Sequence, residues 1–339
     1  MDWISDLKSK IRGRIDFDSQ AREWTWLKVG GKPLFTFFPA GVEDLKLFMK
    51  LRPKNVPFRT FGAASNVLIR DNGYEGVFVK LAKEFREITI SETDVKIGLD
   101  GGVYEVIQEK DQLEQNSQIY EVIVGAGMLG KTLVEKLLEK NLGGIAFLAT
   151  IPGMIGGLIK MNAGAHGQEI KDIVNWVEFM DSSGEIHKIS LENCNFQYRK
   201  SGFQNSDIIL RAGMKCIMVN SAKEAEKIES LLEHRKKTQP ISGKMAGCFF
   251  KNPTIEDFTN PAILANFSNI PPKAWEIIKK SNFPDSENVK ISPIHANFIM
   301  NSENATALEI ETFVQNLQNN IFSKYGIWLK TEIEILGKK

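Results

Sequence analysis

Hydrophobic and polar positions recur with two different periods along the chain, and these periods predict a mixture of helices and strands. Helical spacing occurs in residues 42–50 and again in 129–138, where Leu129, Leu133, Val134, Leu137 and Leu138 share one face and the helix ends near Gly143. Strand-like runs are predicted at residues 56–61, 67–69, 77–79, 86–90, 94–98, 102–107, 119–124 and 207–219. Residues 172–190 predict a hairpin that turns at 182–184. Strands therefore predominate in the first two thirds of the chain.

The pattern changes near residue 221. Residues 222–237 predict a charged amphipathic helix. A capping box at 306–309 opens a further helix, for which Gly326 is the stop signal. The chain is predicted to close on a strand at 327–336, with Glu332 and Glu334 on one face. A smaller α+β unit is therefore expected after the strand-rich part.

Composition narrows the class of protein. A chain of 339 residues is long enough for two or three domains, and 42% hydrophobic and 25% charged residues are ordinary values for a globular protein. The net charge of +1 argues against nucleic acid or another partner recognised mainly by bulk charge. Residues 141–159 carry no charge, but five glycines and a proline predict a buried loop-and-turn segment and not a membrane span. Because the N-terminus also lacks a signal-peptide pattern, we expect a cytoplasmic protein without membrane association.

The three cysteines differ in their surroundings. They are widely spaced and form no CxxC, and no histidine pair has metal-ligand spacing, so neither a disulfide framework nor a metal site is expected. Cys194 and Cys216 lie in apolar runs typical of small buried side chains. Cys248 lies between Gly247 and two phenylalanines, and it either packs in a core turn or transfers a proton.

Two segments rich in small residues stand out, at 62–66 and 151–167. Small residues let a backbone approach a ligand closely and direct successive N–H groups at a phosphate. Neither segment matches the Rossmann or P-loop pattern, and each alone is equally consistent with packed tight turns. Two such segments in one chain favour a large phosphate-bearing cofactor.

Two charged positions are ambiguous from the residues alone. Arg199 is either a carboxylate-binding arginine or a solvated surface residue. Glu332 lies either on the solvent-exposed face of the predicted strand or in a buried position as an acid.

These stretches, taken in order, resemble the UDP-N-acetylenolpyruvoylglucosamine reductases, flavoenzymes of bacterial wall synthesis also called UDP-N-acetylmuramate dehydrogenases. The resemblance extends from about residue 22 to residue 337. It is carried by residues 26–31, 62–71, 151–157, 161–167, 198–201, 239–240, 246–253, 295–301 and Glu332.

The resemblance implies an α+β protein with a two-lobed FAD-binding domain of the vanillyl-alcohol-oxidase (PCMH) type, followed by a smaller α+β substrate-binding domain. The expected division is 1–82 for the first FAD-binding lobe, 83–221 for the second, and 222–339 for the substrate-binding domain. The last strand of that domain is expected to carry Glu332 back to the active site.

The implied activity is NADPH-dependent reduction of UDP-N-acetylglucosamine enolpyruvate to UDP-N-acetylmuramate through bound FAD, a step of peptidoglycan precursor synthesis that serves cell shape and division. The resemblance makes Arg199 and Glu332 the groups at the substrate carboxylate. It places Cys248 where the family most often has the serine that donates a proton. A thiol, with a reference pKa of ~8.5, retains this capacity. No obligate protein partner is evident.

The remaining site residues follow from the same resemblance. The expected FAD-binding residues are Gly62, Ala63, Ala64, Ser65, Asn66, Ile151, Pro152, Gly153, Gly156, Gly157, Asn162, Ala163 and Gly167. The expected substrate-binding residues are Tyr198, Asn252 and one or both of Lys236 and Lys237.

The chain departs from the family pattern in a few places. Alanines 63 and 64 stand where glycine is common, and residues 99–118 and 254–273 are inserted segments without an assigned role. Two other hypotheses remain: a flavin oxidase or dehydrogenase of the same fold acting on another small molecule, and an inactive nucleotide-binding homologue.

Overall fold

The structure is a computed structural model, and it describes residues 2–81, 83–96 and 118–338. The described residues form two compact units, each assembled from separate stretches of chain. The first contains residues 1–16, 36–63 and 76–234, and the second contains residues 17–35, 64–75 and 235–339, within the described ranges. Each unit is described by itself below.

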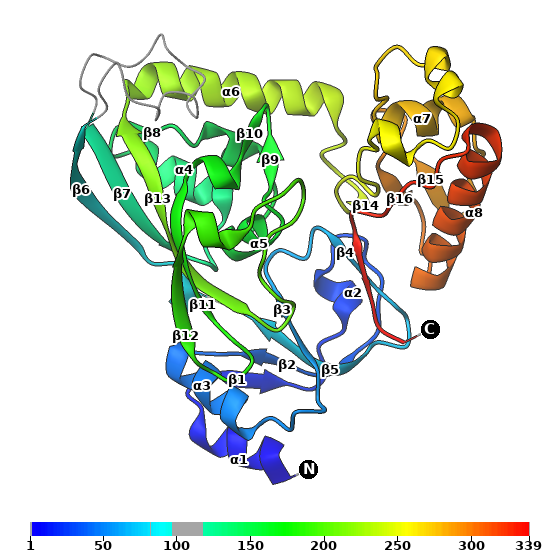
Figure 1. Cartoon of the computed structure of the whole chain (residues 1–339). Helices are drawn as coiled ribbons and strands as arrows, with labels where there is room; N and C mark the ends of the chain where they lie inside the picture. The colour runs from blue at the N-terminus through cyan, green and yellow to red at the C-terminus, as the bar shows by residue number, and fades with distance from the viewer. Residues whose placement is uncertain (1, 82, 97–117, 339) are drawn as a thin grey trace. The chain divides into compact units, whose positions relative to one another are not determined.

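A large antiparallel sheet dominates the first unit (Figure 1). Its order is β12-β11-β13-β7-β6, and the short β8 also pairs with β13. The bounds are β6 (Ile88–Lys96), β7 (Gln118–Gly125), β8 (Leu142–Gly143), β11 (Val174–Met180), β12 (Ile186–Ser190) and β13 (Ile208–Met218). The predicted hairpin at 172–190 is confirmed as β11 and β12. The runs predicted at 86–90 and 94–98 are one strand as far as Lys96, whereas the run at 102–107 lies outside the described residues.

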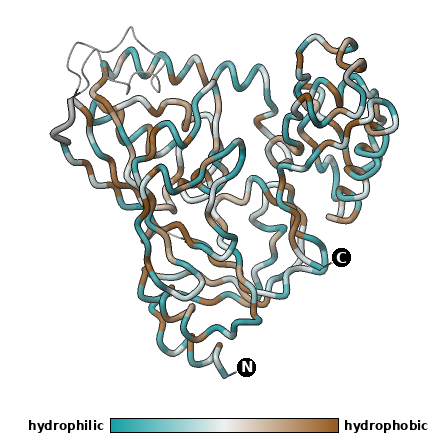
Figure 2. Tube along the Cα trace, viewed as in Figure 1, coloured by the Kyte–Doolittle hydropathy of each residue, from teal (hydrophilic) through white to brown (hydrophobic). Residues whose placement is uncertain are grey.

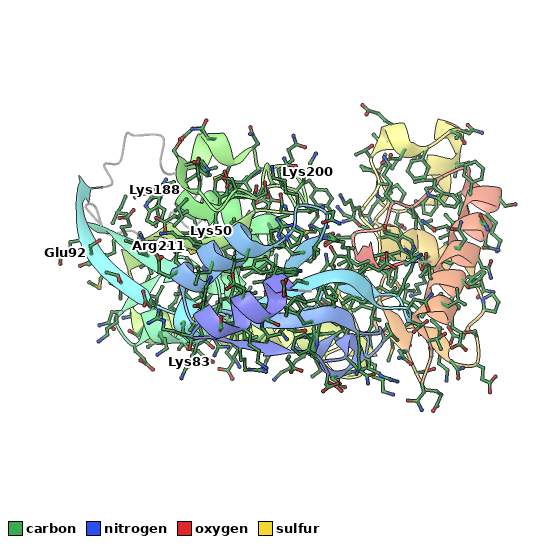
Figure 3. The ribbon with its side chains drawn as sticks, turned by 90° about the horizontal axis from the view of Figure 1, so that it is seen from below. Lys50, Lys83, Glu92, Lys188, Lys200 and Arg211 are labelled. Atoms are coloured by element: carbon green, nitrogen blue, oxygen red, sulfur yellow. The ribbon has the colours of Figure 1, made fainter. Side chains whose placement is uncertain are left out.

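Arg211 and Lys188, both labelled in Figure 3, each contact a residue of the neighbouring strand β11. Arg211 of β13 forms an ion pair with Glu178 of β11 at 2.8 Å. Lys188 of β12 lies over the Trp176 ring of β11, 3.8 Å from its centroid. Such cross-strand pairs fix the register of the hairpin on the sheet. The strands are largely hydrophobic, whereas the long helix α6 (Ser221–Thr238) is more hydrophilic (Figure 2).

Short helices, turns and a small hairpin belong to the same unit as this sheet. They are α4 (Gly130–Leu138), η2 (Ala146–Thr150), α5 (Ile155–Lys160), the hairpin β9 (Gly164–Ala165) and β10 (Gln168–Glu169), η3 (Ile170–Asp172) and η4 (Leu191–Cys194). The α5 helix contacts β13 and β7, and α4 contacts η2. Residues 141–159 are largely buried, as predicted, but they include η2 and the start of α5, so the expectation of loop and turn alone is wrong. Gly156 permits this helix because it packs closely on the 126–128 turn.

A second sheet, of order β1-β2-β5-β3, follows the N-terminal helix α1 (Asp2–Lys10). Its strands are β1 (Arg14–Asp16), β2 (Pro33–Phe38), β3 (Phe58–Phe61) and β5 (Tyr74–Lys80). The predicted helix at 42–50 is α3 (Val42–Leu51). Its Phe48 ring lies 5.3 Å from Phe37 and 5.5 Å from Phe58, centroid to centroid. This aromatic cluster holds α3 on the sheet. The short elements α2 (Ala21–Trp24) and η1 (Lys83–Phe85) complete this part of the chain.

The second unit is built around α7 (Ala274–Ser281), α8 (Ala307–Tyr325) and a sheet of order β14-β16-β15. The strands are β14 (Lys244–Met245), β15 (Val289–Ile291) and β16 (Ile299–Asn301). The predicted capping box is confirmed, since Thr306 accepts a hydrogen bond from the Glu309 N–H, and Gly326 ends α8 at φ 61°. A separate parallel pair joins β4 (Val67–Ile69) to β17 (Glu334–Leu336).

The closing segment corrects one prediction. Only residues 334–336 form a strand, and the prediction of a strand from 327 to 336 is wrong for its first seven residues. Ile327 and Thr331 instead make isolated bridges to Phe258 and Phe250. The segment thus changes neighbours along its length, so its alternating burial does not produce a continuous ladder.

The inserted segment 254–273 belongs to the core of the second unit. It contains η5 (Ile255–Asp257) and η6 (Pro261–Asn266). Phe258, Leu264 and Phe267 are buried in the cluster formed by α7 and α8. This insertion therefore adds hydrophobic core, while residues 99–117 of the other insertion lie outside the described residues. Among the residues that the structure describes, no helix has the length and apolar character needed to cross a membrane.

Candidate active site

The two small-residue segments meet within the first unit. A Cβ added to Gly62 would lie 3.1 Å from the Cβ of Met154, so the turn after β3 contacts the turn before α5. Met154 also bridges to Leu129, the residue before α4. Segments about ninety residues apart in sequence are therefore adjacent, as a shared cofactor site requires.

Glycines in the second segment have different surroundings. A Cβ on Gly153 would lie 2.7 Å from the Leu158 side chain, and one on Gly156 would lie 3.0 Å from Ala126. By contrast, a Cβ on Gly157 would meet no described atom within 4 Å. Close packing therefore explains Gly153 and Gly156, whereas Gly157 offers backbone that a ligand can approach.

Backbone groups at the start of α5 are partly occupied. The Ile155 N–H donates to Met128 O at 2.8 Å, and the Gly156 N–H donates to Ala126 O at 2.9 Å. These two amides are directed at the 126–128 turn. Ile151 and Pro152 are half-buried just before the helix.

The side chain of Asn162 acts as an internal clamp, which here means that its hydrogen bonds link Glu169, Lys171 and Gln197. It is fully buried, and its Nδ2 donates to Glu169 Oε2 at 2.9 Å and to Gln197 O at 3.1 Å. Its Oδ1 accepts the Lys171 N–H at 3.0 Å. Because both amide hydrogens and one oxygen lone pair are engaged within the protein, Asn162 connects the small-residue segment to the turn that carries Arg199.

Arg199 lies in this tight turn. Gln197 and Lys200 exchange backbone hydrogen bonds, and Arg199 between them has φ 54°. Its guanidinium donates to Gly164 O at 3.2 Å and lies 5.1 Å from the centroid of the Tyr198 ring. Tyr198 and Lys200 are exposed, and Arg199 is half-buried (Figure 3 labels Lys200). Arg199 is therefore anchored at one end of the 160–164 segment and partly open to solvent.

Lys160, at the end of α5, is a residue that the sequence analysis missed. Its Nζ donates to Phe203 O, and its backbone oxygen accepts the Ser201 hydroxyl at 2.8 Å. Burial lowers its pKa to about 8; the negative charge of Asp207 raises that pKa, and the positive charge of Arg59 lowers it. The sequence signal was available: a lone lysine follows nineteen uncharged residues.

In the second unit, the loop after β3 lies beside the Cys248 segment. Ala64 is buried with φ 50°, a left-handed conformation that favours glycine, which fits the family's preference at this position. Ser65 O accepts the Gly247 N–H at 3.1 Å. Asn66 Nδ2 donates to Glu332 O at 3.2 Å, and Asn66 O accepts the Glu334 N–H at 3.2 Å.

Cys248 and Glu332 belong to one hydrogen-bonded framework. The Glu332 N–H donates to Phe249 O, the residue after Cys248, at 2.8 Å. Cys248 and Glu332 are half-buried, whereas Glu334 is exposed. The structure thus brings Cys248, Glu332, Ser65 and Asn66 together and gives the two glutamates different surroundings.

The other cysteines behave as predicted. Cys194 and Cys216 are buried, in η4 and β13. Burial, with a smaller contribution from nearby glutamates, raises the pKa of Cys194 to about 11 and that of Cys216 to about 12. Both thiols are therefore kept protonated and enclosed, and Cys248 is the more accessible one.

The proposed substrate-contacting residues of the second unit are dispersed. Asn252 Oδ1 accepts the Ala274 N–H at 3.0 Å and so caps α7. Lys236 and Lys237 are exposed near the end of α6. The described contacts do not select one lysine over the other.

The residues of the first unit fit a flavin nucleotide on two observations. Thr60 Oγ1 is buried without a hydrogen-bond partner among the described residues, two positions before Gly62. The backbone at Gly157 has open space, and Gly167 adopts φ 82°. An unpaired buried hydroxyl and an open glycine, next to two adjoining small-residue turns, match the polar and close contacts that a nucleotide cofactor makes.

Comparison with known proteins identifies the family. Residues 239–336 match the C-terminal domain of UDP-N-acetylenolpyruvoylglucosamine reductase, and residues 108–190 match an FAD binding domain. The reductase of Orientia tsutsugamushi (strain Boryong) is 35% identical over 97% of this chain and 97% of its own length. The reductase of Gluconobacter oxydans (strain 621H) is 29% identical over 100% of this chain and 98% of its own length.

A solved structure agrees with these matches. The crystal structure of UDP-N-acetylenolpyruvylglucosamine reductase from Thermus caldophilus covers 96% of this chain and 100% of its own, with a TM-score of 0.71 and 26% identity. The expected fold class is confirmed as a mixed helix-and-strand protein with an FAD binding domain and a C-terminal reductase domain. The chain belongs to the UDP-N-acetylenolpyruvoylglucosamine reductase family.

Proposed function

We propose that the protein reduces UDP-N-acetylglucosamine enolpyruvate to UDP-N-acetylmuramate with NADPH and bound FAD, in peptidoglycan precursor synthesis. Family membership makes it an FAD-dependent oxidoreductase that acts on a small molecule. The observation that carries the proposal is the framework joining the Cys248 segment to Glu332 through Phe249. A proton donor and a carboxylate held by one backbone bond are what the second half of this reaction needs.

The proposal assigns FAD to the turns at 62–66 and 151–167. Gly62 and Gly157 admit the cofactor closely, and Thr60 supplies a hydroxyl in need of a partner. Asn162 stabilises these turns from within. Bound FAD would supply the hydride chemistry that links NADPH to the enolpyruvyl group.

The chain's own residues handle the charge and the proton. Hydride addition places negative charge on the carbon next to the carboxylate and in the carboxylate itself. Arg199, permanently cationic, stabilises that charge, and one such interaction contributes ~2.7–4 kcal/mol. Glu332 polarises the same carboxyl group. Cys248 Sγ then gives its proton to the substrate carbon, because a thiol is a stronger acid than the serine hydroxyl common in the family.

The rest of the proposal concerns the substrate, the domains and the location. Tyr198, Asn252 and one of Lys236 and Lys237 contact the nucleotide. The functional division is 1–82, 83–221 and 222–339, and the enzyme works in the cytoplasm. These points stay predictions, supported by the resemblance.

The decisive experiment separates the two half-reactions. Cys248→Ala should still let NADPH bleach the flavin absorbance, but product formation should slow about 10²–10⁴-fold, since the proton is needed only in the second half. Cys248→Ser should retain turnover. If NADPH oxidation by the wild type does not depend on the enolpyruvyl nucleotide, the proposed function is wrong. Normal turnover by Cys248→Ala would leave the reaction intact but remove the role of the thiol.

A further inference from the structure

The backbone around Cys248 lacks regular secondary structure. After β14 ends at Met245, residues 246–249 pair with no strand, and Phe250 makes only an isolated bridge to Thr331. A Cβ on Gly247 would meet no described atom within 4 Å. Something other than a β-ladder must therefore fix the position of the thiol.

Asn297 contacts the two residues that follow the cysteine. The Phe249 N–H donates to Asn297 O at 2.7 Å, and the Phe250 N–H donates to Asn297 Oδ1 at 2.9 Å. Asn297 Nδ2 donates to Phe250 O at 2.8 Å. One asparagine thus satisfies three backbone groups of two consecutive residues and takes the place of a neighbouring strand.

Burial makes these bonds hard to replace. Asn297 is 3% exposed, Phe249 is fully buried and Phe250 is 1% exposed. Water has little access to the groups that loss of the amide would leave unpaired, and each such group costs about 1–3 kcal/mol. The remaining polar group of this stretch, Phe249 O, accepts the Glu332 N–H. The Asn297 side chain therefore acts at Phe250, two residues from Cys248, and its backbone oxygen acts at Phe249, whose own oxygen bonds Glu332.

From this arrangement we propose that Asn297 is a positioning residue that sets the location of Cys248 relative to Glu332. The inference rests on the proposed function. Asn297 touches neither reactant in this role; it holds the backbone that presents the thiol. Misplacing a reacting group by about 1 Å costs on the order of 10²-fold in rate.

The same segment offers a matched control. Asn301 is 4% exposed, accepts the Ala305 N–H at 2.9 Å and donates to Leu27 O at 3.0 Å. It is thus an equally buried asparagine whose side chain, like that of Asn297, makes two bonds of 3.0 Å or less, but neither bond reaches Phe249 or Phe250. Asn297→Ala and Asn301→Ala should lose similar stability and differ in their effect on Cys248.

The test compares both variants of the FAD-loaded protein in two assays. In stopped-flow experiments, Asn297→Ala should slow reoxidation of the reduced flavin by the enolpyruvyl nucleotide about 10–100-fold. The rate of flavin reduction by NADPH should stay within twofold of the wild-type rate. A second assay is independent of activity and measures the rate at which iodoacetamide alkylates Cys248, followed by mass spectrometry. This rate should change at least about fivefold, which corresponds to about 1 kcal/mol in the activation free energy. Asn301→Ala should stay within about twofold of wild type in both assays.

Each outcome decides the proposal. Wild-type reoxidation and alkylation rates in Asn297→Ala, or equal changes in Asn301→Ala, would overturn it. Should Asn297→Ala fail to fold, Asn297→Asp keeps the shape and the acceptor for Phe250 but lacks the donated hydrogens, and the same differences are expected in smaller size. A wild-type enzyme that is not reoxidised by the nucleotide, with alkylation changing as expected, would refute the function and keep the positioning role.

Discussion

Replacing Asn162 distinguishes a cofactor contact from an internal clamp. The family resemblance makes this residue a flavin contact, whereas the structure engages its side chain with Glu169, Lys171 and Gln197. Asn162→Ala removes three hydrogen bonds from a site with no solvent exposure. The change reaches the turn of Arg199, two residues beyond Gln197.

The magnitude follows from the groups left behind. The Lys171 N–H loses its partner, at about 1–3 kcal/mol, whereas Gln197 O keeps the Lys200 N–H at 3.1 Å and Glu169 keeps its ion pair with Lys171 at 3.0 Å. The free energy of unfolding should therefore fall by about 1–3 kcal/mol. The loosened Arg199 turn should also slow the second half-reaction, by about tenfold.

Urea unfolding at saturating FAD measures this loss. The matched control is Asn193→Ala, an exposed residue whose described side-chain bond reaches Ser190 Oγ at 3.2 Å, and it should change stability by less than about 0.5 kcal/mol. If Asn162→Ala has wild-type stability but a markedly weaker affinity for FAD, the clamp is refuted and the side chain is a direct cofactor contact.

Two further predictions concern backbone conformation and pH. Ala64→Gly should raise the free energy of unfolding by about 0.5–1 kcal/mol. The left-handed conformation at φ 50° costs alanine about 1–2 kcal/mol, and the greater freedom of glycine in the unfolded chain offsets part of this gain. A lower free energy of unfolding in urea would contradict this prediction. The pKa of Lys160 is about 8 in the folded protein, against an ordinary value of 10.5. Between these two values the folded protein has lost the Lys160 proton while the unfolded chain still binds it. The free energy of unfolding therefore rises with pH from about 8 to 10.5. Lys160→Met should lack this rise, which is on the order of 1–2 kcal/mol once the partial exposure of Lys160 is allowed for. If the free energies of unfolding of the two proteins change in parallel between pH 7.5 and 10.5, the buried cation is refuted.

Local patterns were sufficient for most of the secondary structure. The hairpin at 172–190, the helix at 42–50 and the capping box at Thr306 were predictable because each depends on residues close together in sequence. The closing strand was overextended, since alternating burial at 327–333 reports contact with a core and not the presence of a pairing partner.

The candidate site was predictable only in part. Ordered motifs singled out Cys248, Glu332 and the two small-residue segments, because the chemistry of a residue type is visible in sequence. The roles of Asn162, Asn252 and Asn297 were not visible in this way. An asparagine side chain serves a ligand, a helix end or a buried backbone equally well.

The sequence by itself therefore determined the helices at 42–50, 129–138, 222–237 and after the 306–309 capping box, many of the strands, the family and the reactive groups. These depend on local periodicity and on residue types in a characteristic order. Only the tertiary structure decided which groups are neighbours: Gly62 beside Met154, Asn162 beneath the turn of Arg199, and Asn297 between Phe249 and Phe250. These contacts join residues tens to about ninety positions apart. They exist because each buried polar group needs a partner, and only the folded chain determines which partner lies within reach.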